Sequence, residues 1–246
     1  MNSNEYHGDL HKEHYPKPTV FIILFVILSL LDIAGVITDS LVLKISAKPL
    51  IIPVLIIYLY YNFSKVNHLW LIYAALLFST MGDVFLLFEF MQPAFFLFGV
   101  GAFLVAHIFY IIYFLKIRSW HRSFFRKQPW WLLLIYSYSF GLVMLIYPGL
   151  KEMEVPVIIY AMVITFMIIS SLHVFHKVQS PANKYYLIGA GLFVLSDSML
   201  AIDKFYYKFP LAGTAIMLTY CAAQFLIVQG VVHHKEAPQP KGWWEN

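Results

Sequence analysis

The chain has 246 residues, of which 61% are hydrophobic and 12% are charged, and its mean hydropathy is +0.72. A soluble domain carries about 25% charged residues, so this composition excludes an ordinary soluble domain and favours a polytopic membrane protein. The formal net charge is +4, and the single cysteine, Cys221, excludes both an intramolecular disulfide and a cysteine-based metal cluster.

Apolar runs recur along the whole chain, and each is long enough to cross a hydrocarbon core of ~30 Å as a helix. They lack the alternation that is typical of barrel strands, and only helices or closed barrels satisfy their backbone groups in lipid. The predicted fold is therefore an all-α bundle of eight transmembrane helices in one domain at 19–232, between polar tails at 1–18 and 233–246. The predicted spans are 19–37, 43–61, 68–88, 94–115, 129–147, 155–175, 185–202 and 209–232.

The distribution of basic residues predicts the orientation of these spans. An even number of crossings places both termini on one side, and that side holds twelve of the 17 lysines and arginines. Five of the twelve lie in the loop at 116–127, which we interpret as a topology determinant beside anionic lipid rather than as a nucleic-acid site. The positive-inside rule then places both termini in the cytoplasm. The absence of a targeting pattern favours the bacterial inner membrane.

Two aspartates interrupt these apolar runs. Asp83 lies in the stretch FSTMGDVFLLFE, and Asp197 lies in GLFVLSDSMLAID. Both spans run outward from the cytoplasm, and a rise of ~1.5 Å per residue places the carboxyl groups about 22 and 18 Å into the membrane. Small neighbouring residues permit close helix contact, so we expect the two carboxyl groups to face each other and to share one proton near neutral pH. The alternative is that each aspartate only forms a hydrogen bond between neighbouring helices and has no role in a reaction.

Other polar residues at similar depth predict a polar cavity inside the bundle. His107 and Gln224 lie midway along the fourth and eighth spans, and Tyr220 is one turn from Gln224 on the same face. Lys48 lies near the outer end of the second span. His107 fits a ligand contact and a satisfied core position equally well. Asp32, deep in the first span, has no partner that the sequence identifies.

At these residues the chain resembles the YhhN-like family of integral membrane proteins, the lysoplasmalogenase family. The matching segments are KP at 48–49, GDVFL at 82–86, FLVAHIFY at 103–110, GAGLFVLSDSMLA at 189–201 and YCAAQ at 220–224. The resemblance implies an eight-helix hydrolase with no metal or other cofactor, which cleaves the vinyl ether bond of lysoplasmalogens to a fatty aldehyde and a glycerophospho-alcohol. The expected partners are then a lysophospholipid substrate and membrane lipid, with no nucleic acid and no protein partner.

Vinyl ether hydrolysis begins with proton transfer to the β-carbon, and water then traps the resulting oxocarbenium ion. This chemistry needs one acid and one carboxylate, and we assign these roles to Asp83 and Asp197. Lys48 is expected to bind the phosphate. The remaining residues that we expect to bind substrate are His107, Tyr110, Ser196, Tyr220 and Gln224.

Three other functions remain open at this point. A proton-coupled transporter of small molecules or lipids would use the same aspartates, although the third and seventh spans have neither the mid-span proline nor the inverted repeat typical of that class. An intramembrane aspartyl protease would require GxGD, and Thr80 replaces its first glycine here. A lipid-binding or scaffold protein without turnover is the third alternative.

Overall fold

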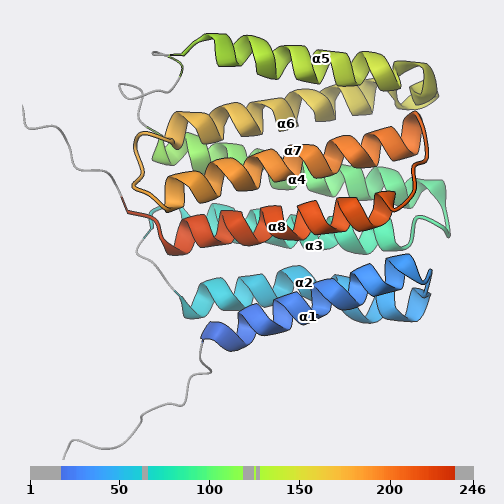
Figure 1. Ribbon diagram of the computed structural model, residues 1–246, viewed down its shortest axis with the longest axis horizontal. Coiled ribbons are helices and arrows are strands. Elements are labelled where there is room, and N and C mark those ends of the chain that lie inside the picture. Colours follow the sequence, from blue (N-terminus) through green and yellow to red (C-terminus); the bar gives the residue numbers. More distant parts are fainter. Residues whose placement is uncertain (1–17, 63–65, 119–124, 126–127, 236–246) are drawn as a thin grey trace, which may run out of the picture.

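Eight α-helices make up most of the computed structural model, which describes residues 18–62, 66–118, 125 and 128–235 (Figure 1). The helices are α1 (Pro18–Ile37), α2 (Leu41–Tyr61), α3 (Leu69–Leu87), α4 (Pro93–Ile117), α5 (Trp130–Leu150), α6 (Glu154–Val174), α7 (Ala182–Phe205) and α8 (Ala212–Val232), and the 3₁₀ turn η2 (Lys151–Met153) joins α5 to α6. No strand occurs among these residues. The all-α class is thus confirmed, and every helix boundary falls within three residues of its expected position. The predicted tails and the basic loop lie largely outside the described residues.

Seven helical stretches of the described chain are long and apolar enough to cross a membrane. One of them, Trp130–Val174, is a run of 45 residues that contains α5, η2 and α6 in succession. Lys151 interrupts this run with a positive φ of 50°, and α6 folds back beside α5 (Figure 1). The chain is therefore a multi-pass integral membrane protein.

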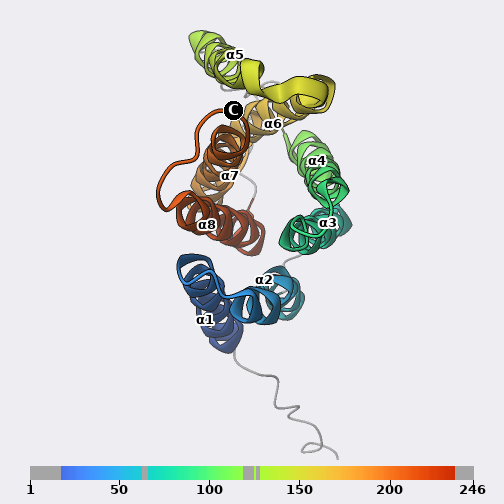
Figure 2. The ribbon, with the colours of Figure 1, turned by 90° about the vertical axis from the view of Figure 1, so that its right-hand side faces the viewer.

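Seven of the helices form a closed ring, which Figure 2 shows in a view along the helices. In order around the ring these helices are α1, α2, α3, α4, α6, α7 and α8, and α8 closes the ring against α1. The eighth helix, α5, stands outside the ring and packs on α6 and α7. The largest fully buried side chains, among them Tyr110, Tyr186 and Phe193, fill the ring interior.

Glycines set the closest helix contacts inside this ring. A Cβ atom at Gly82 of α3 would lie 2.6 Å from the Phe103 ring of α4, and one at Gly189 of α7 would lie 2.8 Å from Ile227 of α8. The small residues beside the two aspartates thus join α3 to α4 and α7 to α8. Among the described residues, no Cα atom of α3 lies within 8 Å of a Cα atom of α7. The expectation that small residues bring these two spans together is wrong.

Candidate active site

The first polar cluster surrounds Asp83 and joins three helices inside the ring. Tyr220 of α8 donates its hydroxyl proton to Asp83 Oδ2 of α3 over 2.6 Å. One turn along α8, Gln224 accepts from the Tyr110 hydroxyl of α4 over 2.6 Å and donates to the Ser79 hydroxyl of α3 over 2.9 Å. All five side chains are buried. Because every bond runs between helices, this cluster fixes α3, α4 and α8 relative to one another.

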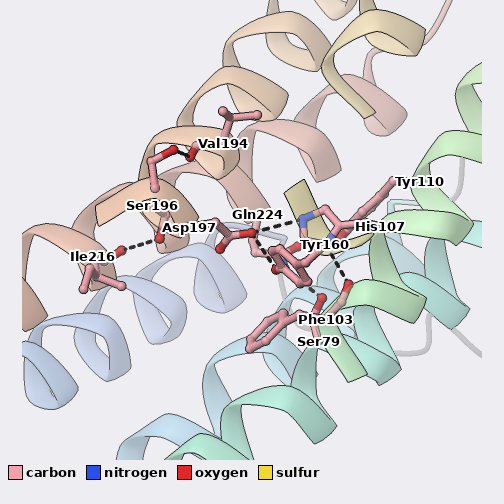
Figure 3. A network of polar contacts seen from close by, with 11 residues as sticks. Ser79, Phe103, His107, Tyr110, Tyr160, Val194, Ser196, Asp197, Ile216 and Gln224 are labelled. Atoms are coloured by element: carbon pink, nitrogen blue, oxygen red, sulfur yellow. Dashed lines mark hydrogen bonds and ion pairs between the residues drawn. The ribbon is translucent and has the colours of Figure 1, made fainter. Parts of the chain in front are cut away.

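The second polar cluster surrounds Asp197 on α7. The Tyr160 hydroxyl of α6 donates to Asp197 Oδ2 over 2.6 Å, and His107 Nε2 of α4 lies 3.6 Å from the same oxygen (Figure 3). On its other side, His107 Nδ1 lies 2.6 Å from the backbone carbonyl oxygen of Phe103. Helices α4, α6 and α7 each contribute one side chain. The cluster forms because these three helices are consecutive in the ring.

The bond to Phe103 fixes which ring nitrogen of His107 carries the proton. A carbonyl oxygen only accepts, so Nδ1 of His107 carries a proton and donates it. In a neutral ring Nε2 is then an acceptor, and it has no hydrogen-bond partner among the described residues, since Asp197 Oδ2 at 3.6 Å lies beyond hydrogen-bond distance. The sequence predicts a proton shared between the two aspartates, whereas the basic neighbour of Asp197 within 4 Å, among the described residues, is His107.

Aromatic rings separate the two clusters. The Phe193 ring centroid lies 4.5 Å from that of His107 and 5.6 Å from that of Tyr220, and the Phe103 ring lies 5.7 Å from Tyr220. Each aspartate has its own tyrosine donor, and the backbones of the two helices that carry the aspartates are not adjacent in the described chain. The expectation that the two carboxyl groups face each other directly is wrong: they accept from different tyrosines, and the aromatic layer formed by Phe103 and Phe193 packs against Tyr220 of one cluster and His107 of the other.

A groove of about 400 Å³ runs along the inner face of α5, against α6 and α7. Its α5 wall extends from Trp131 to Ile146, about 22 Å at ~1.5 Å per residue. Asp197 and Tyr160 line this groove and also a smaller pocket of about 50 Å³, which extends to Phe103. The second cluster thus stands on the wall of a long apolar groove, and the smaller pocket leads from it towards the aromatic layer.

The remaining expected site residues lie in two different places. Lys48 of α2 is half-buried and close enough to Asp83 to interact with it electrostatically. Ser196 donates to the carbonyl oxygen of Ile216 on α8 over 3.0 Å, so its hydroxyl joins two helices and does not point into the groove (Figure 3).

Tyr160 and the other hydroxyl-bearing residues of the groove are not among the site residues expected from the sequence. The Tyr138 hydroxyl donates to Ser198 over 2.8 Å, and the Thr165 hydroxyl donates to Ser139 over 2.7 Å. The run YSYS at 136–139 interrupts the apolar span that became α5, so it was an available signal for a polar surface at mid-depth. Tyr160 gave no such signal, because a lone tyrosine in an apolar run is common in membrane helices.

A helical ring with buried carboxyl groups on its inner faces defines a polytopic membrane protein with a polar site inside the bilayer. Residues 43–231 match the YhhN family, and the chain belongs to that family. Lysoplasmalogenase TMEM86B of Mus musculus is 34% identical over 164 residues, which cover 65% of this chain and 62% of the relative. The human protein of the same name is 34% identical over 172 residues, covering 70% of this chain and 66% of the relative.

A bacterial relative extends this comparison. The lysoplasmalogenase of Mycobacterium tuberculosis is 29% identical over 171 residues, which cover 69% of this chain and 62% of the relative. The chain thus spans just under two thirds of the length of these curated relatives. No solved structure matches the chain.

Proposed function

We propose that the protein is an integral membrane hydrolase that cleaves the vinyl ether bond of lysoplasmalogen-type lysophospholipids to a fatty aldehyde and a glycerophospho-alcohol. The proposal is supported by membership of the YhhN family and by relatives whose names include lysoplasmalogenase. The observation that carries it is the Asp197–His107 pair on the wall of a long apolar groove. A single-chain lipid fits such a groove, since one apolar chain matches its lining and the polar pair lies partway along it.

In the first step Asp197 and His107 supply the proton. The vinyl ether accepts this proton at its β-carbon, which becomes a methylene group, and the α-carbon and ether oxygen become an oxocarbenium ion. The β-carbon is the first carbon of the apolar chain beyond the reacting α-carbon. An acid on the groove wall is therefore on the correct side of the scissile bond. Tyr160 orients the carboxyl group through its short hydrogen bond.

In the second step water adds to the α-carbon, loses a proton and forms a hemiacetal, which collapses to the aldehyde and the glycerol hydroxyl. Positive charge develops towards the glycerol side of the bond, so a second carboxylate helps most on that side. We assign this role to Asp83, which is held by Tyr220 and lies on the Lys48 side of the bundle. In this proposal the substrate extends from the groove past Phe103, which lines the smaller pocket, towards Asp83, with its phosphate at Lys48.

We further propose that α5 and α6 each cross the membrane, which gives eight crossings with both termini in the cytoplasm. Each of these helices has 21 residues, enough for one crossing. A location in the bacterial inner membrane stays a prediction from the sequence. Labelling of single added cysteines from either side of the membrane tests this topology, with Cys221 first replaced by Ala.

The test of the activity is aldehyde release from lysoplasmenyl-ethanolamine by the purified protein, coupled to an aldehyde dehydrogenase. The saturated alkyl-ether analogue is the matched control and should release nothing. In D₂O the product should carry one deuterium at the carbon next to the carbonyl, because the proposed first step protonates that carbon. Absence of aldehyde release from the folded protein would refute the proposal. Uptake of a solute by liposomes that contain the protein would favour a transporter instead.

A further inference from the structure

The groove beside α5 contains a short hydrogen-bonded chain whose first oxygen accepts no bond. The Tyr138 hydroxyl of α5 donates to Ser198 of α7 over 2.8 Å, and Ser198 in turn donates to the backbone carbonyl oxygen of Val194 over 2.6 Å. Tyr138 has no other hydrogen bond among the described residues. A hydroxyl oxygen whose proton is already donated still accepts. Because Tyr138 and Ser198 both line the groove, this acceptor is available to a ligand there.

A second free acceptor lies on the same groove wall. Asp197 Oδ2 takes the hydrogen bond from Tyr160 and lies beside His107, whereas Oδ1 has no hydrogen bond among the residues that the structure describes. The Asp197 side chain is 13% exposed and lines the groove. Since Asp197 directly precedes Ser198 on α7, the Tyr138 oxygen lies within one residue of Asp197 along that helix.

Two acceptors without a donor match what a nucleophilic water needs. Water that attacks a carbocation directs a lone pair at the carbon, so its two protons have to be held by other groups. Two acceptors hold both protons and leave the lone pair free, whereas a donor would occupy it. The Tyr138 proton is committed to Ser198, and the Ser198 proton is committed to Val194, so neither hydroxyl competes for that lone pair.

We propose that Tyr138 and Asp197 hold the water that captures the oxocarbenium ion, and that Ser198 keeps Tyr138 in its role as an acceptor. The inference rests on the proposed function and supplies the residues of its second step. The water oxygen bonds to the α-carbon, one water proton passes to Asp197, and the π electrons return to the ether oxygen. The pair of Asp197 and His107 gives up one proton in the first step and recovers one here, so the site is restored.

The lysolipid carries an internal competitor for this water. Its sn-2 hydroxyl closes a five-membered cyclic acetal when it bonds to the α-carbon in place of water and passes its proton to Asp197. This acetal is an isomer of the substrate, because no water has been added. The ratio of cyclic acetal to aldehyde therefore reports how well the site holds water, and a change that only slows the first step leaves that ratio unaltered.

Mass spectrometry of the products formed in D₂O tests this water site, with purified protein and lysoplasmenyl-ethanolamine. Either product carries one carbon-bound deuterium, which distinguishes the acetal from unreacted substrate, and an incubation without protein sets the background. The wild type should form mostly aldehyde. Tyr138→Phe should raise the ratio of cyclic acetal to aldehyde roughly 10-fold, the effect expected from the loss of one hydrogen bond. Ser198→Ala should raise the ratio as well, because Tyr138 is then free to donate to the water.

Two neighbouring positions on α5 provide matched controls. Tyr136 is 49% exposed, as Tyr138 is, but it does not line the groove, so Tyr136→Phe should change neither the rate nor the ratio. Ser139→Ala removes the hydroxyl that accepts from Thr165 of α6 over 2.7 Å and thus loosens α5 by a comparable bond. This variant should keep the wild-type ratio.

The outcomes separate this inference from the proposed function. Aldehyde release by the wild type, with the same product ratio in Tyr138→Phe, overturns the water site and leaves the hydrolase. An equal rise of the ratio in Ser139→Ala overturns it too, because the effect then belongs to the position of α5. A folded wild-type protein that forms neither product refutes the hydrolase and the water site with it. If Tyr138→Phe does not fold, the ratio in Ser198→Ala decides the matter.

Discussion

Tyr160 donates its hydroxyl proton to Asp197 across the α6–α7 interface, at an oxygen–oxygen distance of 2.6 Å. Both side chains line the groove beside α5 and also the smaller pocket that extends to Phe103. The bond thus holds the carboxyl group at the junction of the two spaces. Its loss would free the carboxyl group to turn away from a bound lipid, and this gives the first test of the mechanism.

Tyr160→Phe should lower kcat/KM for lysoplasmenyl-ethanolamine about 10- to 100-fold, because it removes one hydrogen bond to a charged group worth about 1.5–3 kcal/mol. Tyr147→Phe is the matched control, since Tyr147 is exposed at the end of α5 and its hydroxyl contacts Glu154 over 3.3 Å. That variant should keep wild-type kinetics. Equal rates for Tyr160→Phe and wild type would remove Tyr160 from the mechanism.

Asp197 and His107 should behave as one functional unit. Asp197→Asn should lower kcat at least 10³-fold, and His107→Phe should lower it about 10²-fold, since positioned acid–base groups contribute factors of this size. Because both changes remove the same shared proton, the double variant should be no slower than Asp197→Asn alone. The measurement is single-turnover aldehyde release, with thermal unfolding of each variant as the folding control. Effects that multiply would show that the two residues act independently.

The sequence predicts the helices well because each apolar run carries its own length and composition. It does not predict which helices meet, because that depends on contacts between distant positions. Asp83 takes its hydrogen bond from Tyr220, 137 residues away, and Asp197 takes its bond from Tyr160, 37 residues away. The similar depth of the two aspartates follows from the span lengths, but it does not reveal that Phe103 and Phe193 pack between their clusters. The depth of a residue was therefore predictable from the sequence, and its hydrogen-bond partner was not.

Gln224 should affect stability more than chemistry. Gln224→Met keeps a similar volume but leaves the Tyr110 and Ser79 hydroxyls buried without their partner. Each orphaned group costs about 1–3 kcal/mol, so the unfolding temperature should fall clearly. The loss of kcat in the protein that remains folded should be much smaller than for Asp197→Asn. A variant with unchanged stability and abolished turnover would instead assign Gln224 a direct role in the reaction.

The groove along α5 should select for long apolar chains. Leu142→Trp replaces an aliphatic side chain on the groove wall with a bulkier indole ring. KM should therefore rise for long-chain substrates and change less for short-chain ones. Leu133→Trp is the control, because Leu133 lies on the same helix, is 69% exposed and does not line the groove. Identical chain-length profiles for the two variants would show that substrate does not enter beside α5.

The contact between Gly82 and Phe103 links helix packing to the site. A Cβ atom at position 82 would lie 2.6 Å from the Phe103 ring, and the backbone carbonyl of Phe103 accepts the His107 bond. Gly82→Ala should therefore displace Phe103, lower the unfolding temperature and reduce turnover through His107. Gly101→Ala, on α4 with nothing within 4 Å of the added atom, should leave both quantities unchanged or slightly raise stability. If Gly82→Ala lowers stability but spares kcat, the aromatic layer only packs the helices; if both fall together, the layer also positions the proton donor.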